Sequence, residues 1–405
     1  MVVGSVQFPQ MHPVSGFRLG TVEAGIRYAG RRDLVVMELC EGSRLAAVFT
    51  SNAFCAAPVT ICREHLDKST PRYLVTNTGN ANAGTGRQGY EDAKACCQAM
   101  ADIAGCSTEQ VLPFSTGVIG ESLPVERITA GLPAAFEGLS EDGWEDAGWG
   151  ILTTDTVPKG ASVQVPMGDR MITISGITKG SGMIRPDMAT MLAYLATDAE
   201  LPDELLQACL HDAVDASFNR ITVDGDTSTN DSCVLVATGR SGVAITDVNG
   251  DDYHRFCRAV TEICEALAQA IVRDGEGATK LITIDVTGAR DEDEAARVAY
   301  TVAHSPLVKT AFFAGDPNWG RILAAVGRAG VDGLDLDALT IHLDDVCIVS
   351  QGGRDAAYEE SLGQAVMQRD EIGIVIDLKR GGAHTRVWTC DFSYDYVKIN
   401  AEYRS

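Results

Sequence analysis

The chain has 405 residues, 45% of them hydrophobic and 22% charged, which is an ordinary composition for a globular protein and excludes extended disorder as its main state. Because 56 acidic residues outnumber 33 basic ones, the formal net charge of −23 argues against a nucleic-acid or anionic-membrane partner and favours a small-molecule or protein partner. The length exceeds that at which one hydrophobic core usually stops growing, so we expect two substructures or one large mixed α/β domain.

Three residue patterns bear on location and cofactors. Residues 1–11 carry neither lysine nor arginine nor a long apolar core, so we expect no cleavable signal there, and no charge-free apolar run is long enough to span a bilayer. The twelve cysteines form no CxxC pair and several fall inside apolar patterns, so we interpret them as buried free thiols of a cytoplasmic protein. The seven histidines form no HxH, HxxxH or HExxH pair, so neither a metal centre nor a resident cofactor is expected.

The hydrophobic pattern predicts strands and helices in mixed order, after about 15 loosely held residues. Strands are predicted at residues 45–50, 72–76, 151–156, 171–175, 191–196, 232–237, 281–286, 339–343, 346–350, 372–378 and 385–392. Helices are predicted at residues 90–104, 125–139, 202–214 and 253–272, polar loops at 77–86 and 114–120, and a solvated acidic turn at 291–294. Clustered strands with interspersed helices indicate a layered α/β or α+β architecture.

One stretch, residues 179–198 (KGSGMIRPDMATMLAYLATD), combines a flexible entry with a buried strand. A glycine-rich segment leads through Pro186 to Thr190, where the predicted strand begins. A threonine hydroxyl becomes a useful nucleophile when cleavage of the preceding peptide bond frees its own α-amine, whose pKa of about 7.7 to 8 suits a general base. On chemistry alone, the alternative is an ordinary β-branched residue at the start of a core strand.

Two other patterns match known binding motifs incompletely. Residues 84–89 read GxGxxG, but the loop before them is too long for a dinucleotide site and no acid-tipped second strand follows. Residues 224–228 resemble the start of a calcium loop, but Thr229 and Leu235 stand where glycine and glutamate are required. A G-x-S-x-G hydrolase motif is absent.

Several long motifs give the chain a family resemblance over essentially its whole length. They are TNTGNANAGTG from Thr76, STGVIGE from Ser115, TTDT from Thr153, KGSGMIRPDMATML from Lys179, GEGATK from Gly275, GDPNWGRI from Gly315 and the C-terminal YVKINAEYRS. Through them the chain resembles the ornithine acetyltransferase family, also called the bifunctional glutamate N-acetyltransferases of arginine biosynthesis.

The resemblance implies a layered αββα sandwich similar to that of N-terminal-nucleophile hydrolases. It implies self-cleavage between Ala189 and Thr190, which gives an α chain of residues 1–189 and a β chain of residues 190–405, assembled as an α2β2 heterotetramer. Thr190 would take the acetyl group from N-acetylornithine as an ester and pass it to glutamate in a ping-pong cycle. The family's members differ in whether acetyl-CoA also serves as donor, and no motif here decides that point.

The resemblance also assigns roles to individual residues. Thr116 and Gly117 would supply the oxyanion donors; without the resemblance, an ordinary tight turn is an equal alternative. Lys179 would bind the substrate carboxylate and Glu276 the ammonium end of ornithine. The remaining substrate contacts would be Thr156, Thr190 itself, Asn400 and Ser405, the last of which requires the chain terminus to fold back into the site. Alone, each would more often be a surface residue.

The chain departs from the family pattern at three positions. Arg185 and Asp187 stand where a small residue and asparagine are common, which bears on the rate of self-cleavage, and Gly84 stands where cysteine is frequent. Two other functions remain open at this stage: an amidohydrolase or aminopeptidase on the same self-cleaving scaffold, and a processed but inactive binding protein.

Overall fold

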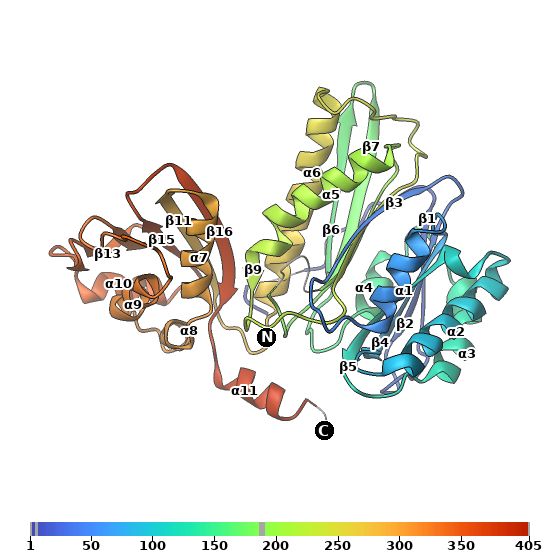
Figure 1. Cartoon of the computed structure of the whole chain (residues 1–405), viewed down its shortest axis with the longest axis horizontal. Coiled ribbons are helices and arrows are strands. Elements are labelled where there is room, and N and C mark those ends of the chain that lie inside the picture. Colours follow the sequence, from blue (N-terminus) through green and yellow to red (C-terminus); the bar gives the residue numbers. More distant parts are fainter. Residues whose placement is uncertain (1, 5–6, 186–190, 404–405) are drawn as a thin grey trace. The chain divides into compact units, whose positions relative to one another are not determined.

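The computed structural model describes residues 2–4, 7–185 and 191–403 (Figure 1). The chain forms two compact units. Unit 1 comprises residues 1–6, 220–225 and 272–405, and unit 2 comprises residues 7–219 and 226–271. Of the two alternatives that the chain length allowed, two substructures or one large mixed α/β domain, the structure shows the first.

Unit 2 contains a four-stranded sheet, sheet A, with the order β1-β2-β4-β5. Its strands are β1 (Phe17–Val22), β2 (Leu34–Leu39), β4 (Tyr73–Asn80) and β5 (Val111–Val118). The β4 and β5 strands run parallel, whereas the other neighbours are antiparallel. One face of the sheet packs against two helices, α2 (Gly86–Ala104) and α3 (Val125–Glu137), through a shared core of buried apolar side chains.

Unit 2 also contains a five-stranded sheet, sheet B, with the order β3-β10-β8-β7-β6. Its strands are β3 (Arg44–Phe49), β10 (Ser232–Ala237), β8 (Leu192–Thr197), β7 (Arg170–Lys179) and β6 (Lys159–Met167). Figure 1 shows α5 (Asp203–Ala216) and α6 (Asp251–Arg273) running along this sheet. A side chain added at Gly176 of β7 would meet Leu267 of α6 at 3.3 Å, so helix and sheet are in close contact.

The two sheets of unit 2 pack face to face. Their common core joins Val35 and Met37 of sheet A to Ile177 and Val234 of sheet B. Tyr194 of β8 lies at its centre: its ring stands edge-on to Phe114 at 5.3 Å, and its hydroxyl makes a 2.8 Å hydrogen bond with Thr76. Helix, sheet, sheet and helix thus follow one another, and the predicted layered αββα sandwich is confirmed.

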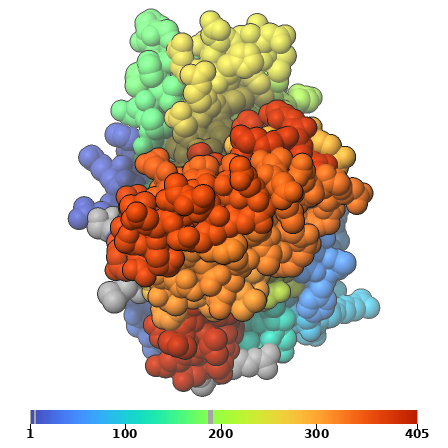
Figure 2. All heavy atoms as spheres, turned by 90° about the vertical axis from the view of Figure 1, so that its left-hand side faces the viewer, coloured from blue at the N-terminus to red at the C-terminus, as the bar shows by residue number. Residues whose placement is uncertain are grey.

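Unit 1 is built on a seven-stranded sheet with the order β14-β13-β12-β15-β11-β16-β9. The strands are β9 (Ile221–Thr222), β11 (Leu281–Ala289), β12 (Thr340–Leu343), β13 (Val346–Ser350), β14 (Gly353–Arg354), β15 (Glu371–Asp377) and β16 (Ala383–Cys390). The helices are α7 (Glu292–Ala303), α8 (Pro306–Phe313), α9 (Trp319–Gly327), α10 (Glu360–Met367) and α11 (Tyr394–Ala401). Figure 2 shows the side chains of its orange segments closing over one another into a continuous surface.

Several sequence predictions of local structure are wrong. Residues 151–156 do not form a strand; they follow α4 (Trp144–Gly150) as turns, which suits their polar composition. The loops expected at 77–86 and 114–120 begin as strand, because β4 continues to Asn80 and β5 to Val118. The acidic run 291–294 is the start of α7, not a solvated turn. Helix α1 (Ala57–Leu66) was not anticipated either.

Candidate functional site

Thr116 and Gly117 lie near the end of β5, so the tight-turn interpretation of these residues is wrong. Gly117 is paired with Gly79 of the parallel neighbour β4 and has a φ of +136°. A Cβ atom there would lie 2.3 Å from the carbonyl carbon of Gly79. Glycine is needed here because the backbones of β4 and β5 approach each other closely.

The asparagine-rich motif that starts at Thr76 fastens the ends of these strands. Asn77 accepts a 2.5 Å hydrogen bond from the Ser115 hydroxyl and donates to the Asn80 carbonyl. From the other side, Asn230 donates to the carbonyls of Ala81 and Ser115, at 2.6 and 2.9 Å. The motif therefore serves as a rigid support for the residue before Thr116.

Lys179 joins sheet B to Thr116. It is the last residue of β7, it is 9% exposed, and it pairs in register with Leu192 at the start of β8. Its ammonium donates a 3.1 Å hydrogen bond to the Thr116 hydroxyl oxygen. The structure thus brings two predicted site residues together, next to the strand that begins two positions after Thr190.

A buried ion pair that the sequence analysis missed lies beside Lys179. The side chains of Asp155 and Lys159 are both 0% exposed, and the ammonium of Lys159 lies 2.6 Å from a carboxylate oxygen of Asp155. The backbone N–H of Gly180, the residue after Lys179, donates to the same oxygen at 2.7 Å. The TTDT motif contains Asp155, but the strand predicted at residues 151–156 gave this carboxylate no role.

The charge state of Asp155 follows from its neighbours. Burial opposes ionisation, but the positive charges of Lys159 and Lys179, with the hydrogen bonds from Lys159 and Gly180, hold the pKa of the Asp155 carboxyl well below its usual value. The group is therefore a carboxylate at neutral pH, in direct electrostatic contact with the site.

Unit 1 brings together another predicted pair, Glu276 and Asn400. The Asn400 amide of α11 donates a 2.7 Å hydrogen bond to the carboxylate of Glu276, which is 5% exposed. Asp391 fixes the segment after Glu276, because its carboxylate accepts from the backbone N–H groups of Thr279 and Lys280 at 2.8 and 2.9 Å. A carboxylate held in this way can bind a cation such as an alkylammonium group.

The remaining predicted site residues are Thr156, Ala189, Thr190 and Ser405. Thr156 is exposed in the turns after α4. Ala189, Thr190 and Ser405 lie outside the described residues, as does Asp187.

Comparison with known proteins decides the family. The model of the ArgJ family matches residues 18–405. The chain belongs to the ArgJ family. The arginine biosynthesis bifunctional protein ArgJ of Pseudomonas fluorescens is 55% identical over the whole of both chains. That of Methylococcus capsulatus is 57% identical over 97% of this chain and 96% of its own.

Solved structures of similar proteins include a bifunctional ArgJ protein from Bacillus halodurans. It is 40% identical, covers 50% of this chain and 95% of its own, and superposes with a TM-score of 0.48. An ornithine acetyltransferase from Mycobacterium tuberculosis, complexed with ornithine, is 31% identical over 44% of this chain and 94% of its own, with a TM-score of 0.39.

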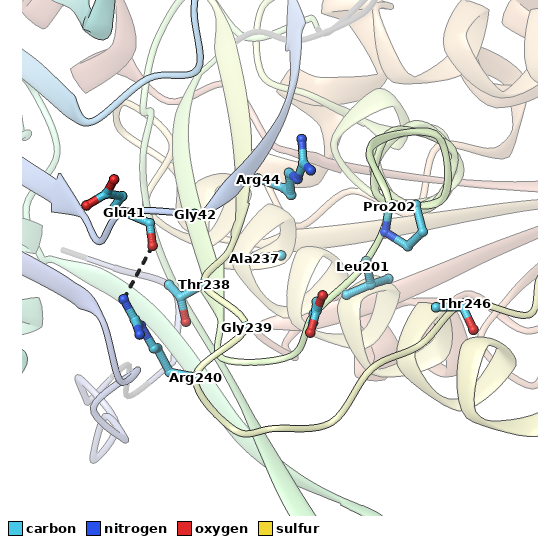
Figure 3. A pocket seen from close by; sticks show the side chains of 11 residues that line it. Glu41, Gly42, Arg44, Leu201, Pro202, Ala237, Thr238, Gly239, Arg240 and Thr246 are labelled. Carbon is cyan, nitrogen blue, oxygen red and sulfur yellow. Dashed lines mark hydrogen bonds between the residues drawn. The ribbon is translucent and has the colours of Figure 1, made fainter.

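This ArgJ family member also has a pocket of about 420 Å³ in unit 2, lined by none of the predicted site residues (Figure 3). Its charged side chains are Glu41, Arg44, Glu200 and Arg240. Two of these already have protein partners: Arg44 lies 3.1 Å from the carboxylate of Asp203, and Arg240 donates to the Glu41 carbonyl oxygen. With balanced charges and its arginines already paired, the pocket shows no clear ligand preference.

Among the described residues, no helix is both long enough and apolar enough to cross a membrane.

Proposed function

We propose that the protein transfers the acetyl group of N2-acetyl-L-ornithine to L-glutamate, giving L-ornithine and N-acetyl-L-glutamate. Membership of the ArgJ family supports this proposal, as do the names of its bifunctional arginine-biosynthesis relatives. The structural observation that carries it is the buried hydrogen bond from Lys179 to Thr116. We propose that the protein uses no resident cofactor and that it acts in the reducing cytoplasm. Acetyl-CoA is an alternative acetyl donor to be tested.

The nucleophile in this proposal is Thr190, freed by self-cleavage after Ala189. Its hydroxyl attacks the acetyl carbonyl carbon while its α-amine accepts the hydroxyl proton. The tetrahedral intermediate then collapses, the amide C–N bond breaks, and the proton passes to the departing α-amine of ornithine. The amine of glutamate attacks the acetyl-Thr190 ester and regenerates the free threonine.

The oxyanion formed in each half-reaction needs fixed donors about 2.7 to 3.1 Å away. Because the Thr116 hydroxyl oxygen already accepts from Lys179, its own hydrogen remains for another acceptor. The nearby ammonium polarises that hydroxyl, which strengthens the bond it donates. We assign the second donor to Gly117.

The substrates are α-amino acids, and the proposal gives each charged end a partner. Lys179 binds the carboxylate, and Glu276, oriented by Asn400, binds the side-chain ammonium of ornithine. Thr156 and Ser405 complete the substrate contacts. The two chains, residues 1–189 and 190–405, assemble as an α2β2 heterotetramer, which mass photometry of the purified protein can test.

The first experiment is intact-mass measurement of wild type, Thr190→Ala and Thr190→Ser, with ornithine release assayed with and without glutamate. We expect two masses, summing to the full chain plus one water, for the wild type, and one uncut mass with no turnover for Thr190→Ala. Thr190→Ser keeps a hydroxyl and an α-amine, so it should cut and turn over more slowly. A single uncut wild-type mass would remove the proposed base and defeat the mechanism.

The same assay separates the rival functions. Ornithine release that is equal with and without glutamate indicates a hydrolase, because water would then resolve the acyl-enzyme. Binding of N-acetylornithine without release under either condition indicates an inactive binding protein.

A further inference from the structure

Asp155 uses both carboxylate oxygens inside unit 2. One oxygen accepts from the Lys159 ammonium at 2.6 Å and from the Gly180 N–H at 2.7 Å, and the other accepts from the Thr153 N–H at 3.1 Å. A carboxylate that is 0% exposed is stable as an anion only when it is paired and hydrogen-bonded in this way. Three hydrogen bonds therefore hold the Asp155 carboxylate in one position.

The position of Gly180 links this carboxylate to the site. Gly180 follows Lys179 directly, so the bond to Asp155 fixes the backbone at the point where β7 ends and the Lys179 side chain turns toward Thr116. The Asp155 charge acts on the Lys179 ammonium as well. One carboxylate thus controls both the backbone next to Lys179 and the charge near it.

We propose that Asp155 is a positioning residue, which aligns the Lys179 ammonium with Thr116 and with the substrate carboxylate while Lys159 anchors Asp155 from behind. The simpler alternative is that Asp155 only neutralises Lys159. The assignment of a substrate carboxylate to Lys179 rests on the proposed function. The hydrogen bonds from Lys159 and Gly180 to Asp155 are observed in the structure and do not depend on that function.

The test uses L-ornithine as a non-reacting ligand, with its Kd measured by calorimetry on processed protein, alongside the KM and kcat of acetyl transfer. Asp155→Asn alone leaves Lys159 buried beside an amide and can fail to fold, so the decisive variant is Asp155→Asn with Lys159→Met, which removes both charges. We expect this double variant to bind ornithine about ten- to a hundredfold more weakly, the range for losing a hydrogen bond to a charged group. KM should rise similarly, with a smaller change in kcat.

Lys179→Ala provides the comparison that shows the route of the effect. If Asp155 acts through Lys179, adding Lys179→Ala to the double variant should weaken ornithine binding no further than Lys179→Ala alone. Asp203→Asn, which removes an exposed ion pair with Arg44 elsewhere in unit 2, serves as the control and should leave Kd and KM unchanged.

Each outcome is decisive. Wild-type affinity for ornithine in the double variant would show that Asp155 merely neutralises Lys159, and would overturn the proposal. Additive losses with Lys179→Ala would overturn it too, as would a wild-type protein that does not bind ornithine. A wild type that binds ornithine but releases none from N-acetylornithine refutes the proposed function alone, since the Kd comparison still decides the role of Asp155.

Discussion

Gly117 carries the tightest structural demand at the candidate site. Its φ of +136° is unfavourable for any side chain, and a Cβ would lie within 2.3 to 2.7 Å of the Gly79 and Asn80 backbone. Gly79 and Asn80 belong to β4, so their backbone atoms cannot move aside without disturbing the pairing of β4 with β5.

We therefore predict that Gly117→Ala lowers the free energy of unfolding by at least about 2 kcal/mol, combining backbone strain with overpacking, and reduces acetyl transfer. Gly120→Ala is the matched control. Its φ is also positive, +82°, but nothing lies within 4 Å of its Cβ position, so it should show only the strain, about 1 kcal/mol. Urea unfolding of both variants measures the difference, and equal losses would contradict the role of the Gly79 contact.

The residues of the site differ in how far the sequence revealed them. Thr116, Gly117 and Lys179 were assigned to one site through the family resemblance, and the structure shows that Lys179 contacts Thr116. Asp155 was missed because residues 151–156 were predicted as a strand, which gives no sign that this carboxylate is buried beside Lys159. Its burial depends on Lys159 and Gly180, and the contact with Gly180 becomes visible only when the strands have paired.

Among the elements, long periodic helices such as α6 were predicted well, whereas two neighbouring strands of sheet A, the edge strand β1 and the apolar β2, were not predicted. Strand β1 contains Gly20, which is unfavourable for a strand by propensity. In the fold it is required, because a Cβ there would lie 2.0 Å from the Ala135 carbonyl oxygen of α3. Strand propensity fails here because helix packing decides the residue.

Helix α7 was also not predicted, because its first turn lies in the acidic run 291–294, which resembles a solvated turn. The first turn begins at the cap Asp291, whose carboxylate accepts from the Glu294 N–H at 2.8 Å. The Glu294 side chain is itself 0% exposed and lies 2.6 Å from Arg290 and 3.1 Å from Arg380. Burial opposes its ionisation, but its hydrogen bonds and both arginine charges lower the pKa of Glu294 below its usual value.

A glutamate whose pKa is lower in the folded than in the unfolded state stabilises the fold above its unfolded pKa of about 4.3, and the contribution is lost as the pH falls through the folded pKa. We predict that Glu294→Gln costs about 1.5 to 3 kcal/mol at pH 7. The difference from wild type should shrink progressively below a pH of about 4. Hydrogen exchange of α7 peptides in urea, at pH 7 and at a pH below about 4, measures this difference in stability.

Glu292→Gln provides the control in the same turn. Glu292 pairs with Arg220, but its side chain is 63% exposed, so its loss should cost less than about 1 kcal/mol. If the two variants are equally stable, or if the Glu294→Gln deficit persists unchanged at low pH, the buried ion pairs do not have the stabilising role assigned here.

At the scale of the molecule, the chain length allowed either two substructures or one large domain, and it did not indicate where two substructures would divide. Unit 1 takes residues 220–225 from the middle of the chain, because β9 pairs with β16 through Ile221 and Trp388. A two-residue strand carries no periodicity, and its partner lies far away in the sequence, so only the folded chain reveals the connection. The division of a chain by contacts is thus independent of the proposed cleavage after Ala189.

Both units keep their cysteines as free thiols, which gives a test of the whole structure. Seven are buried and five are partly exposed, so the prediction of buried thiols holds for the larger group. The buried ones are Cys62, Cys96, Cys97, Cys209, Cys233, Cys264 and Cys390. Burial raises the pKa of Cys96 and of Cys264 to about 12 and that of Cys390 to about 11, so almost none of these three is thiolate at pH 8.

We predict that iodoacetamide at pH 8 leaves all seven buried thiols unmodified in the native protein and alkylates all twelve cysteines in urea. Among the partly exposed ones, Cys257 should react faster than Cys106 and Cys347. Hydrogen bonding, first with Cys209, lowers the pKa of Cys257, whereas burial raises the pKa values of the other two. Peptide mass spectrometry over time gives each rate. Native alkylation of Cys233 or Cys390 at the rate seen in urea would mean that the core of the corresponding unit is not closed in solution.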